Sequence, residues 1–312
     1  MKIFIKYTLA FFACLAAYAY PNKALALHCI ADTTATLKPG SVIYGSNRYT
    51  QFVVGDLASP IILSSPHAGT LRPNEIPDRT EGVLKSDVFV TDLVLKMADT
   101  IQKLTGLRPH IIINNLHRIK MEPNRSLDDA FLTNADAIAA WNDYQGFIMK
   151  ARKIVKQHVG KGLYLDMHGH AHPIHRIEVG YLLRPAELNE DDAAIDKKAS
   201  QSSIRALALS TKKPFSALIR GDISLGTLLQ NEGYRAVPSK QEPTPGTDKY
   251  FNGGYCTAEY GSRNGGNISA IQLETPGVDV RNTPALRAKS SGAIARAALK
   301  YLSLNYGMNL IR

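Results

Sequence analysis

The chain has 312 residues, 45% hydrophobic and 21% charged, with a formal net charge of +10. These are the values of a globular protein, and no heptad run or fixed-period repeat indicates a coiled coil or a solenoid. The basic residues are scattered and no nucleic-acid reading motif is present, so we expect no nucleic-acid partner and interpret the positive charge as attraction for anionic substrates or envelope surfaces.

Residues 1–26 have the pattern of a signal peptide. Two lysines precede an uncharged apolar stretch at residues 8–20, and Ala24-Leu25-Ala26 is a small-x-small cleavage site. The apolar stretch is short for a membrane-spanning helix, although an uncleaved anchor is the alternative. We therefore predict a cut after Ala26, a periplasmic or secreted protein without a stable membrane span, and a single α/β domain at 27–312.

Two cysteines remain after this cut, Cys29 and Cys256. In an oxidising compartment such a pair is a disulfide candidate that would tie the mature N-terminus to a late loop. Two unrelated thiols are the alternative.

Short apolar runs alternate with amphipathic runs along the chain, which predicts alternating strands and helices. In chain order we expect a strand at 60–65, a helix at 90–104, a strand at 110–113, a helix at 134–160, a strand at 163–166, a helix at 191–210, a strand at 215–220, a helix at 224–234, a loop at 241–267, a strand at 268–273 and a helix at 284–302. This alternation predicts an α/β fold with a mixed, largely parallel sheet and helices on both faces. In such folds the ligand binds beyond the carboxyl ends of the strands.

Two histidines lie at such strand ends, His67 and His168. A catalytic zinc has three protein ligands, usually His and carboxylate, and one open position. We therefore predict one Zn²⁺ per chain, held by His67, His168 and a carboxylate. Asp87, at the start of a helix, is the favoured third ligand, although an Asp there is also a common N-cap. Asp78 and Glu81 are its competitors.

The segment around His168 contains further histidines in the pattern His168-x-His170-x-His172. An extended segment places alternate side chains on one side of the sheet. We interpret His170 as a residue that lines the site and contacts the substrate.

Glu274 follows the last apolar strand and is the candidate general base. Hydrolysis at zinc requires a carboxylate that takes a proton from water and passes it to the leaving amine. Burial of a glutamate at the end of an apolar strand is costly unless the side chain is paired or functional. A salt-bridged glutamate is the alternative.

Two arginines, Arg118 and Arg125, follow another predicted strand. The guanidinium group binds a carboxylate through two parallel hydrogen bonds, so this pair suits a small acidic substrate. Structural ion pairs are the alternative for each arginine.

Taken in order, five motifs resemble N-formylglutamate amidohydrolase-like proteins. They are Ser65-Pro66-His67-Ala68-Gly69, Ile76-Pro77-Asp78-Arg79, Ser86-Asp87, Leu116-His117-Arg118 with Pro123-Asn124-Arg125, and Asp166-Met167-His168-Gly169-His170. The resemblance implies a fold similar to that of zinc carboxypeptidases (phosphorylase/hydrolase-like). It also implies His67 and His168 as zinc ligands and Glu274 as the base. The substrate would be held by Arg118, Asn124 and Arg125, with Arg79 as a further contact.

The sequence departs from the implied pattern in two ways. The His-x-x-Glu motif of carboxypeptidases is absent, because the third residue after His67 is Thr70. An export signal is also unexpected for an enzyme of cytoplasmic histidine breakdown, so a peptide, an acylated amino acid or an envelope fragment suits the location better than N-formylglutamate.

We therefore expect an exported zinc-dependent amidohydrolase that cleaves a C–N amide bond of an N-acyl amino acid or small peptide with a free carboxylate. A zinc metallocarboxypeptidase acting on peptides or envelope fragments is one alternative. A non-catalytic exported binding protein for an acidic ligand is another.

Overall fold

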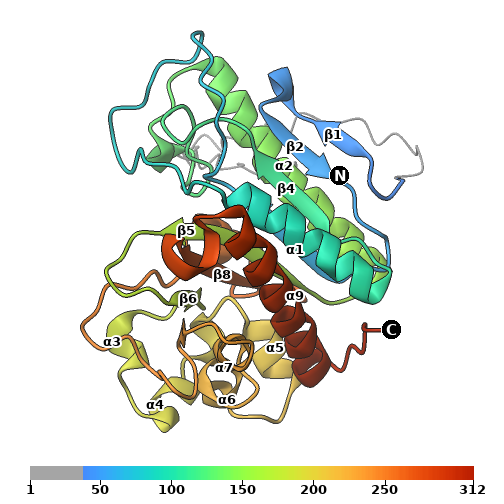
Figure 1. The fold of residues 1–312 in the computed structure, drawn as a ribbon, viewed down its shortest axis with the longest axis vertical. Helices are drawn as coiled ribbons and strands as arrows, with labels where there is room; N and C mark the ends of the chain where they lie inside the picture. Colours follow the sequence, from blue (N-terminus) through green and yellow to red (C-terminus); the bar gives the residue numbers. More distant parts are fainter. Residues whose placement is uncertain (1–37) are drawn as a thin grey trace, which may run out of the picture. The chain divides into compact units, whose positions relative to one another are not determined.

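Eight strands form one mixed sheet in the computed structural model, which describes residues 38–312 (Figure 1). The strands are β1 (Val42–Tyr44), β2 (Thr50–Val53), β3 (Ile61–Ser65), β4 (His110–Asn114), β5 (Gly162–His170), β6 (Ile177–Gly180), β7 (Ala236–Val237) and β8 (Ile268–Pro276). Their order across the sheet is β1-β2-β4-β3-β5-β8-β6-β7. The predicted α/β fold class is confirmed.

The four central strands, β4, β3, β5 and β8, run parallel to one another. The flanking strands run the other way, because β2 is antiparallel to β4 and β6 is antiparallel to β8. The carboxyl ends of the central strands therefore meet at one edge of the sheet, and the N-terminal end of β6 lies at the same edge.

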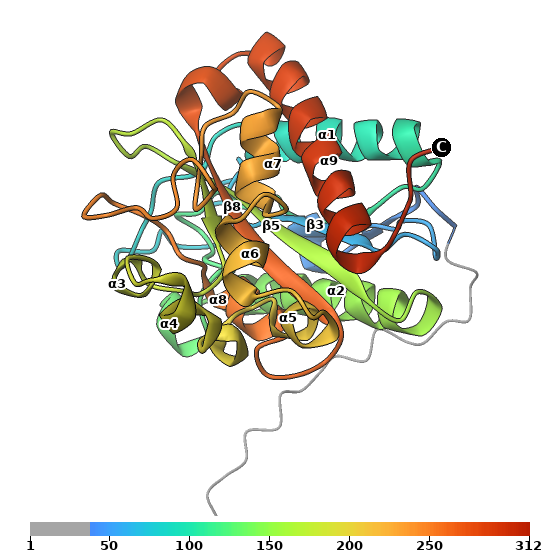
Figure 2. The ribbon, with the colours of Figure 1, turned by 90° about the horizontal axis from the view of Figure 1, so that it is seen from below.

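Helices cover both faces of this sheet (Figure 2). They are α1 (Val90–Thr105), α2 (Ala135–His158), α3 (Pro185–Leu188), α4 (Asp192–Asp196), α5 (Arg205–Ser210), α6 (Phe215–Arg220), α7 (Leu225–Asn231), α8 (Tyr255–Tyr260) and α9 (Pro284–Tyr306). The helices α1 and α9 pack against each other on one face, and α2 lies on the opposite face.

The two faces of the central strands differ in polarity. On the face covered by α1 and α9, side chains such as Leu63, Leu165 and Leu273 belong to the main apolar core. On the α2 face, apolar side chains give way near the carboxyl edge to buried polar ones, including Ser64 and Asp166. Buried polar groups require hydrogen-bond partners. The part of the α2 face near the carboxyl ends of the strands is therefore polar and can support a functional site.

One predicted strand is wrong. Residues 215–220 form helix α6, not a strand. Phe215, Leu218 and Ile219 are buried and stand at the i, i+3, i+4 spacing of a helix, and Pro214 precedes the first turn. The short apolar run concealed this periodicity.

Other boundaries also differ from those expected from the sequence. The predicted helix at 191–210 is broken into α4, a 3₁₀ turn and α5. The predicted loop at 241–267 contains α8, which buries Cys256 and Thr257. Strand β5 is longer than predicted and includes His168 and His170. Strands β1, β2, β6 and β7 are short and were not predicted.

The predicted signal peptide and cleavage site lie outside the described residues. Cys29 does too, so the proposed disulfide stays a prediction; Cys256 is buried with its Sγ 3.4 Å from the carbonyl oxygen of Pro123. Among residues 38–312, no helix has the length and apolar character needed to cross a membrane.

Candidate metal centre and active site

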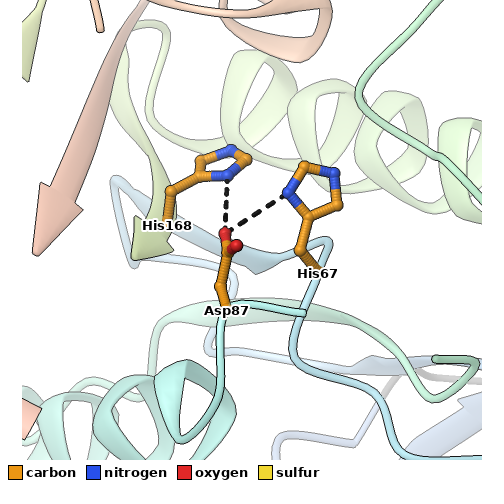
Figure 3. A group of neighbouring side chains, drawn as sticks. All are labelled: His67, Asp87 and His168. Carbon is orange, nitrogen blue, oxygen red and sulfur yellow. Dashed lines mark hydrogen bonds and ion pairs between the residues drawn. The ribbon is translucent and has the colours of Figure 1, made fainter. Parts of the chain in front are cut away.

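Three side chains that are far apart in the sequence converge at the carboxyl edge of the sheet (Figure 3). The Oδ2 atom of Asp87 lies 3.3 Å from Nδ1 of His67 and 3.2 Å from Nδ1 of His168. All three residues are buried. Two imidazole nitrogens and a carboxylate oxygen at this separation could hold a metal ion, and three such ligands are the usual number at a catalytic zinc.

Main-chain contacts fix Asp87 between the two histidines. Its N–H donates to the carbonyl oxygen of His67 at 3.0 Å, and its Oδ2 accepts from the N–H of Gly169 at 3.1 Å. The competing acids lie elsewhere: Asp78 pairs with Lys120 at 2.8 Å, and Glu81 is exposed. The structure thus brings Asp87, rather than Asp78 or Glu81, to the histidines.

The far ring nitrogen of each histidine also has a partner. Nε2 of His67 lies 2.5 Å from Oε1 of Glu122, and Nε2 of His168 lies 3.1 Å from Oδ2 of Asp166. Metal-binding histidines usually donate this second N–H to a carboxylate or carbonyl group, which fixes the ring and the tautomer. The arrangement therefore leaves both Nδ1 atoms directed at one point beside Asp87, and the residues present fit a bound zinc.

The charges around this point favour a cation. Burial acts to raise the pKa of Asp87, but the two histidines outweigh it and hold the pKa well below its usual value. Burial acts to lower the pKa of His168, but Asp166 and Asp87 outweigh it and raise the pKa well above the usual value. Positive charge is therefore stabilised at this cluster, as a divalent cation requires.

Glu274 lies beside the cluster. It is directly opposite His168 in the β5–β8 pairing, and its Oε1 lies 4.0 Å from Nδ1 of His168. Oε1 accepts from Nε2 of Gln272 at 3.0 Å, whereas the buried Oε2 has no partner among the described residues. Burial raises the pKa of Glu274 to about 8, against the influence of His168. A buried carboxylate with one oxygen to spare is suited to accept a proton.

Arg118 joins the site through two carboxylates. Its Nε donates to Oε2 of Glu122 at 2.8 Å, and its Nη1 lies 3.6 Å from Oδ1 of Asp87. Arg125 is exposed and lines a neighbouring cavity of about 400 Å³. The other residues of that cavity are Arg79, Gly82, Val83, Glu122, Asp129 and Phe131.

Arg79 and Asn124 brace this region. The guanidinium group of Arg79 donates to the carbonyl oxygens of Ala130 and Arg118, both at 2.9 Å, and of Glu81 at 3.0 Å. Its donors thus hold the loop that walls the cavity. Oδ1 of Asn124 accepts from the N–H of Cys256 at 2.8 Å, and Nδ2 of Asn124 lies 3.2 Å from Nε2 of His168.

His170 points to the same side of β5 as His168, as the alternation predicted. Its Nε2 lies 2.9 Å from the carbonyl oxygen of Arg176, and its Nδ1 accepts from the N–H of His172 at 3.1 Å. Burial lowers the pKa of His170 to about 4. Main-chain groups contact both ring nitrogens, so the orientation of the ring beside the site is fixed.

Several contributors were not anticipated from the sequence. Asp166 and Glu122 were not predicted as site residues, although both are close in sequence to residues that were. Asp166 is two residues before His168, and Glu122 lies between Arg118 and Arg125. Arg281 is also new: its guanidinium donates to the carbonyl oxygens of Thr275, Val88 and His170. No local pattern marks that arginine, because its three partners lie in different segments.

No protein-family model and no curated protein matches this sequence. Solved structures with a related fold include N-formylglutamate amidohydrolase from Ralstonia eutropha JMP134, which is 13% identical over 80% of this chain and 95% of that chain, with a TM-score of 0.49. The gene product Atu2144 from Agrobacterium tumefaciens is 12% identical over 80% of this chain and 94% of that chain, with a TM-score of 0.45. The N-acetylmuramyl-L-alanine amidase Ami1 from Mycobacterium abscessus is 16% identical over 79% of this chain and 100% of that chain, with a TM-score of 0.35. The first of these carries the family name that the motifs resemble, and at this level of similarity it assigns no activity to this chain.

Proposed function

We propose that this protein is a zinc-dependent amidohydrolase that cleaves the amide bond of an N-acyl amino acid or small peptide bearing a free carboxylate. The observation that carries the proposal is the convergence of two Nδ1 atoms on Oδ2 of Asp87, with Glu274 beside them. The signal-peptide pattern of residues 1–26 supports action in the periplasm or outside the cell.

The residues of the chain suggest how the reaction would proceed. His67, Asp87 and His168 would hold zinc, which supplies Lewis-acid polarisation of a carbonyl group and a lower pKa for water. Water adds its oxygen to the carbonyl carbon, and the C–N bond breaks to give a carboxylate and an amine. Glu274 would take the proton from the attacking water and deliver it to the leaving nitrogen.

The arginines would fix the other end of the substrate. Arg125 is exposed to solvent and lines the same cavity as Glu122, so its guanidinium group is available to bind the substrate carboxylate. Arg118 is already paired with Glu122, and its Nη1 is directed toward the metal cluster. We therefore assign Arg118 to the carbonyl oxygen on which negative charge develops, and Arg125 to the free carboxylate.

The decisive experiment combines metal content with turnover. The purified mature protein, His168→Ala and Glu274→Gln are measured for zinc by plasma mass spectrometry and for hydrolysis of N-acyl amino acids and short peptides. We expect about one zinc per chain in the wild type and in Glu274→Gln, and none in His168→Ala. Turnover in Glu274→Gln should fall by about 10²–10⁴-fold, the usual contribution of a general base.

The exposed Glu81→Gln is the matched control and should keep both zinc and turnover. Absence of zinc from the wild type after metal supply would refute the metal site. Tight retention of an acidic ligand without turnover would favour the exported binding protein. Release of free amino acids from peptides alone would favour the metallocarboxypeptidase.

A further inference from the structure

The order of the strands sets the order of side chains across the site. The arginines follow β4, His67 follows β3, His168 belongs to β5, and Glu274 belongs to β8. The next strand is β6, where Glu178 stands directly opposite Glu274. Residues in register on neighbouring strands point to the same face. Glu178 therefore continues the row beyond Glu274, on the side away from the arginines.

Glu178 holds two other groups in place. Its Oε1 lies 2.7 Å from Nδ1 of His172, and its Oε2 accepts from the N–H of Phe251 at 2.7 Å. Glu178 itself is 1% exposed. A buried carboxylate with both oxygens engaged orients its partners firmly.

The two partners stack on each other. The ring centroids of His172 and Phe251 are 4.5 Å apart, with an interplanar angle of 28°. Phe251 nevertheless remains 45% exposed. We name these two rings the His172–Phe251 platform. The platform presents the exposed part of an aromatic ring to solvent, and the buried Glu178 fixes its orientation, so a flat group can stack on it without reordering the side chain.

This platform does not have the character of a second metal site, although His170, His172 and Glu178 lie close together. Both ring nitrogens of His170 are hydrogen-bonded to main-chain groups, and Nδ1 of His172 is paired with Glu178. A metal would have to break main-chain hydrogen bonds to gain its third ligand.

We propose that the His172–Phe251 platform binds the acyl group of the substrate, and that this group is apolar or planar and larger than formyl. The inference rests on the proposed function: with the carboxylate at Arg125 and the scissile amide at the cluster, the acyl group extends past Glu274 toward β6. There it meets a stacked aromatic surface, which suits a flat or aliphatic group. Phe251 is the specificity-determining residue, and Glu178 positions it.

The test compares kcat/KM for N-formyl-, N-acetyl-, N-hexanoyl- and N-benzoyl-glutamate in the wild type, Phe251→Ala and Phe131→Ala. Phe131 is the matched control, because it is 52% exposed and lines the cavity on the arginine side. In the wild type we expect the benzoyl and hexanoyl substrates to be preferred over formyl. Phe251→Ala should lower kcat/KM for them by about three- to tenfold, the size of one lost aromatic contact, and leave formyl within about twofold.

Phe131→Ala should keep the ratio of kcat/KM for the benzoyl and formyl substrates whatever its effect on the rate, since Phe131 lies at the arginine end of the row. An equal effect of Phe251→Ala on all four substrates, or the same change of ratio in Phe131→Ala, would overturn the assignment. Two zinc ions per chain, one of them lost in Glu178→Gln, would overturn it in favour of a second metal site.

Failure of the proposed function has a different signature. If no substrate is hydrolysed by any variant, binding can still be measured. Calorimetric titration of the wild type and Phe251→Ala with N-benzoyl- and N-formyl-glutamate then tests whether the platform binds the acyl group. Tighter binding of the benzoyl compound, lost in Phe251→Ala, would support it without catalysis. Equal affinities in the two proteins would overturn it.

Discussion

Glu122 shows how a residue that does not face the metal position can still determine it. Its Oε1 lies 2.5 Å from Nε2 of His67 and accepts from the N–H of Asn124, while its Oε2 pairs with Arg118. One buried carboxylate thus sets the ring of a predicted ligand and the side chain of a predicted substrate contact. The arginine and the histidine were visible in the sequence as separate motifs. Their link through Glu122 is a tertiary contact without local periodicity.

We expect Glu122→Gln to lower zinc affinity by about 10–100-fold, because the partner that orients His67 loses its charge. Competition with a chromophoric chelator measures the affinity. Asp129→Asn is the control, since Asp129 lines the same cavity without contacting either histidine. Unchanged affinity in Glu122→Gln would mean that His67 is held by other contacts.

His110 predicts a pH dependence of stability that is separate from the site. It begins β4, is fully buried, and its Nδ1 accepts from the N–H of Gly55 at 3.0 Å. Burial lowers its pKa from 6.5 to about 4. Between these values only the unfolded chain binds the proton, so the free energy of unfolding falls as the pH falls from about 6.5 toward 4.

Urea denaturation at pH 7.5 and pH 5 measures this effect. We expect the wild type to lose about 2 kcal/mol more than His110→Asn between the two pH values, because the asparagine does not titrate and offers an acceptor near Nδ1. An equal loss in both proteins would show that His110 is protonated in the folded state.

At the scale of secondary structure, the elements that were predicted correctly carry strong local signals. Helix α1 has apolar residues at helical spacing and ends at Gly106, whose φ of 74° is the left-handed conformation that glycine tolerates. Helix α2 begins after Asn134, whose side chain caps the N–H groups of Asp136 and Ala137. Strand β6 has only four residues, and its place beside β8 depends on pairing across the chain. That placement could not be predicted, so Glu178 was missed with it.

The turn after β8 is fastened to its neighbours by Arg281, and Gly169 makes room for this side chain. A Cβ atom on Gly169 would lie 2.6 Å from the guanidinium carbon of Arg281. We expect Gly169→Ala to destabilise the fold by about 1–3 kcal/mol through this overlap. Thermal or urea denaturation measures it.

The double variant Gly169→Ala with Arg281→Ala separates this overlap from other effects of the methyl group. If the clash is the cause, the second substitution removes it. The double variant then loses less stability than the sum of the losses in the two single variants. Additive losses would place the cost of Gly169→Ala in the main chain near Asp87 instead.

For the whole molecule, metal binding should increase the free energy of unfolding. A ligand that binds only the folded state at about 100 times its dissociation constant adds about 2.7 kcal/mol, which for a chain of this size raises Tm by several degrees. We expect chelator to lower the Tm of the wild type and zinc to restore it. His168→Ala should show neither change, and a similar shift in that variant would place the metal elsewhere.

The parallel pairing of β3, β5 and β8 also has a consequence for how the protein matures. His67 directly follows β3, whereas His168 and Glu274 stand on β5 and β8, and these three neighbouring strands come from widely separated parts of the chain. Such non-local pairings form late and slowly during folding, because a long loop must close before each one. The metal position therefore does not exist in a nascent or partly folded chain, and a truncated chain that ends before β8 lacks both the base and a central partner of β5. Acquisition of zinc would then follow the pairing of β3 with β5, and its rate would report on that step of folding.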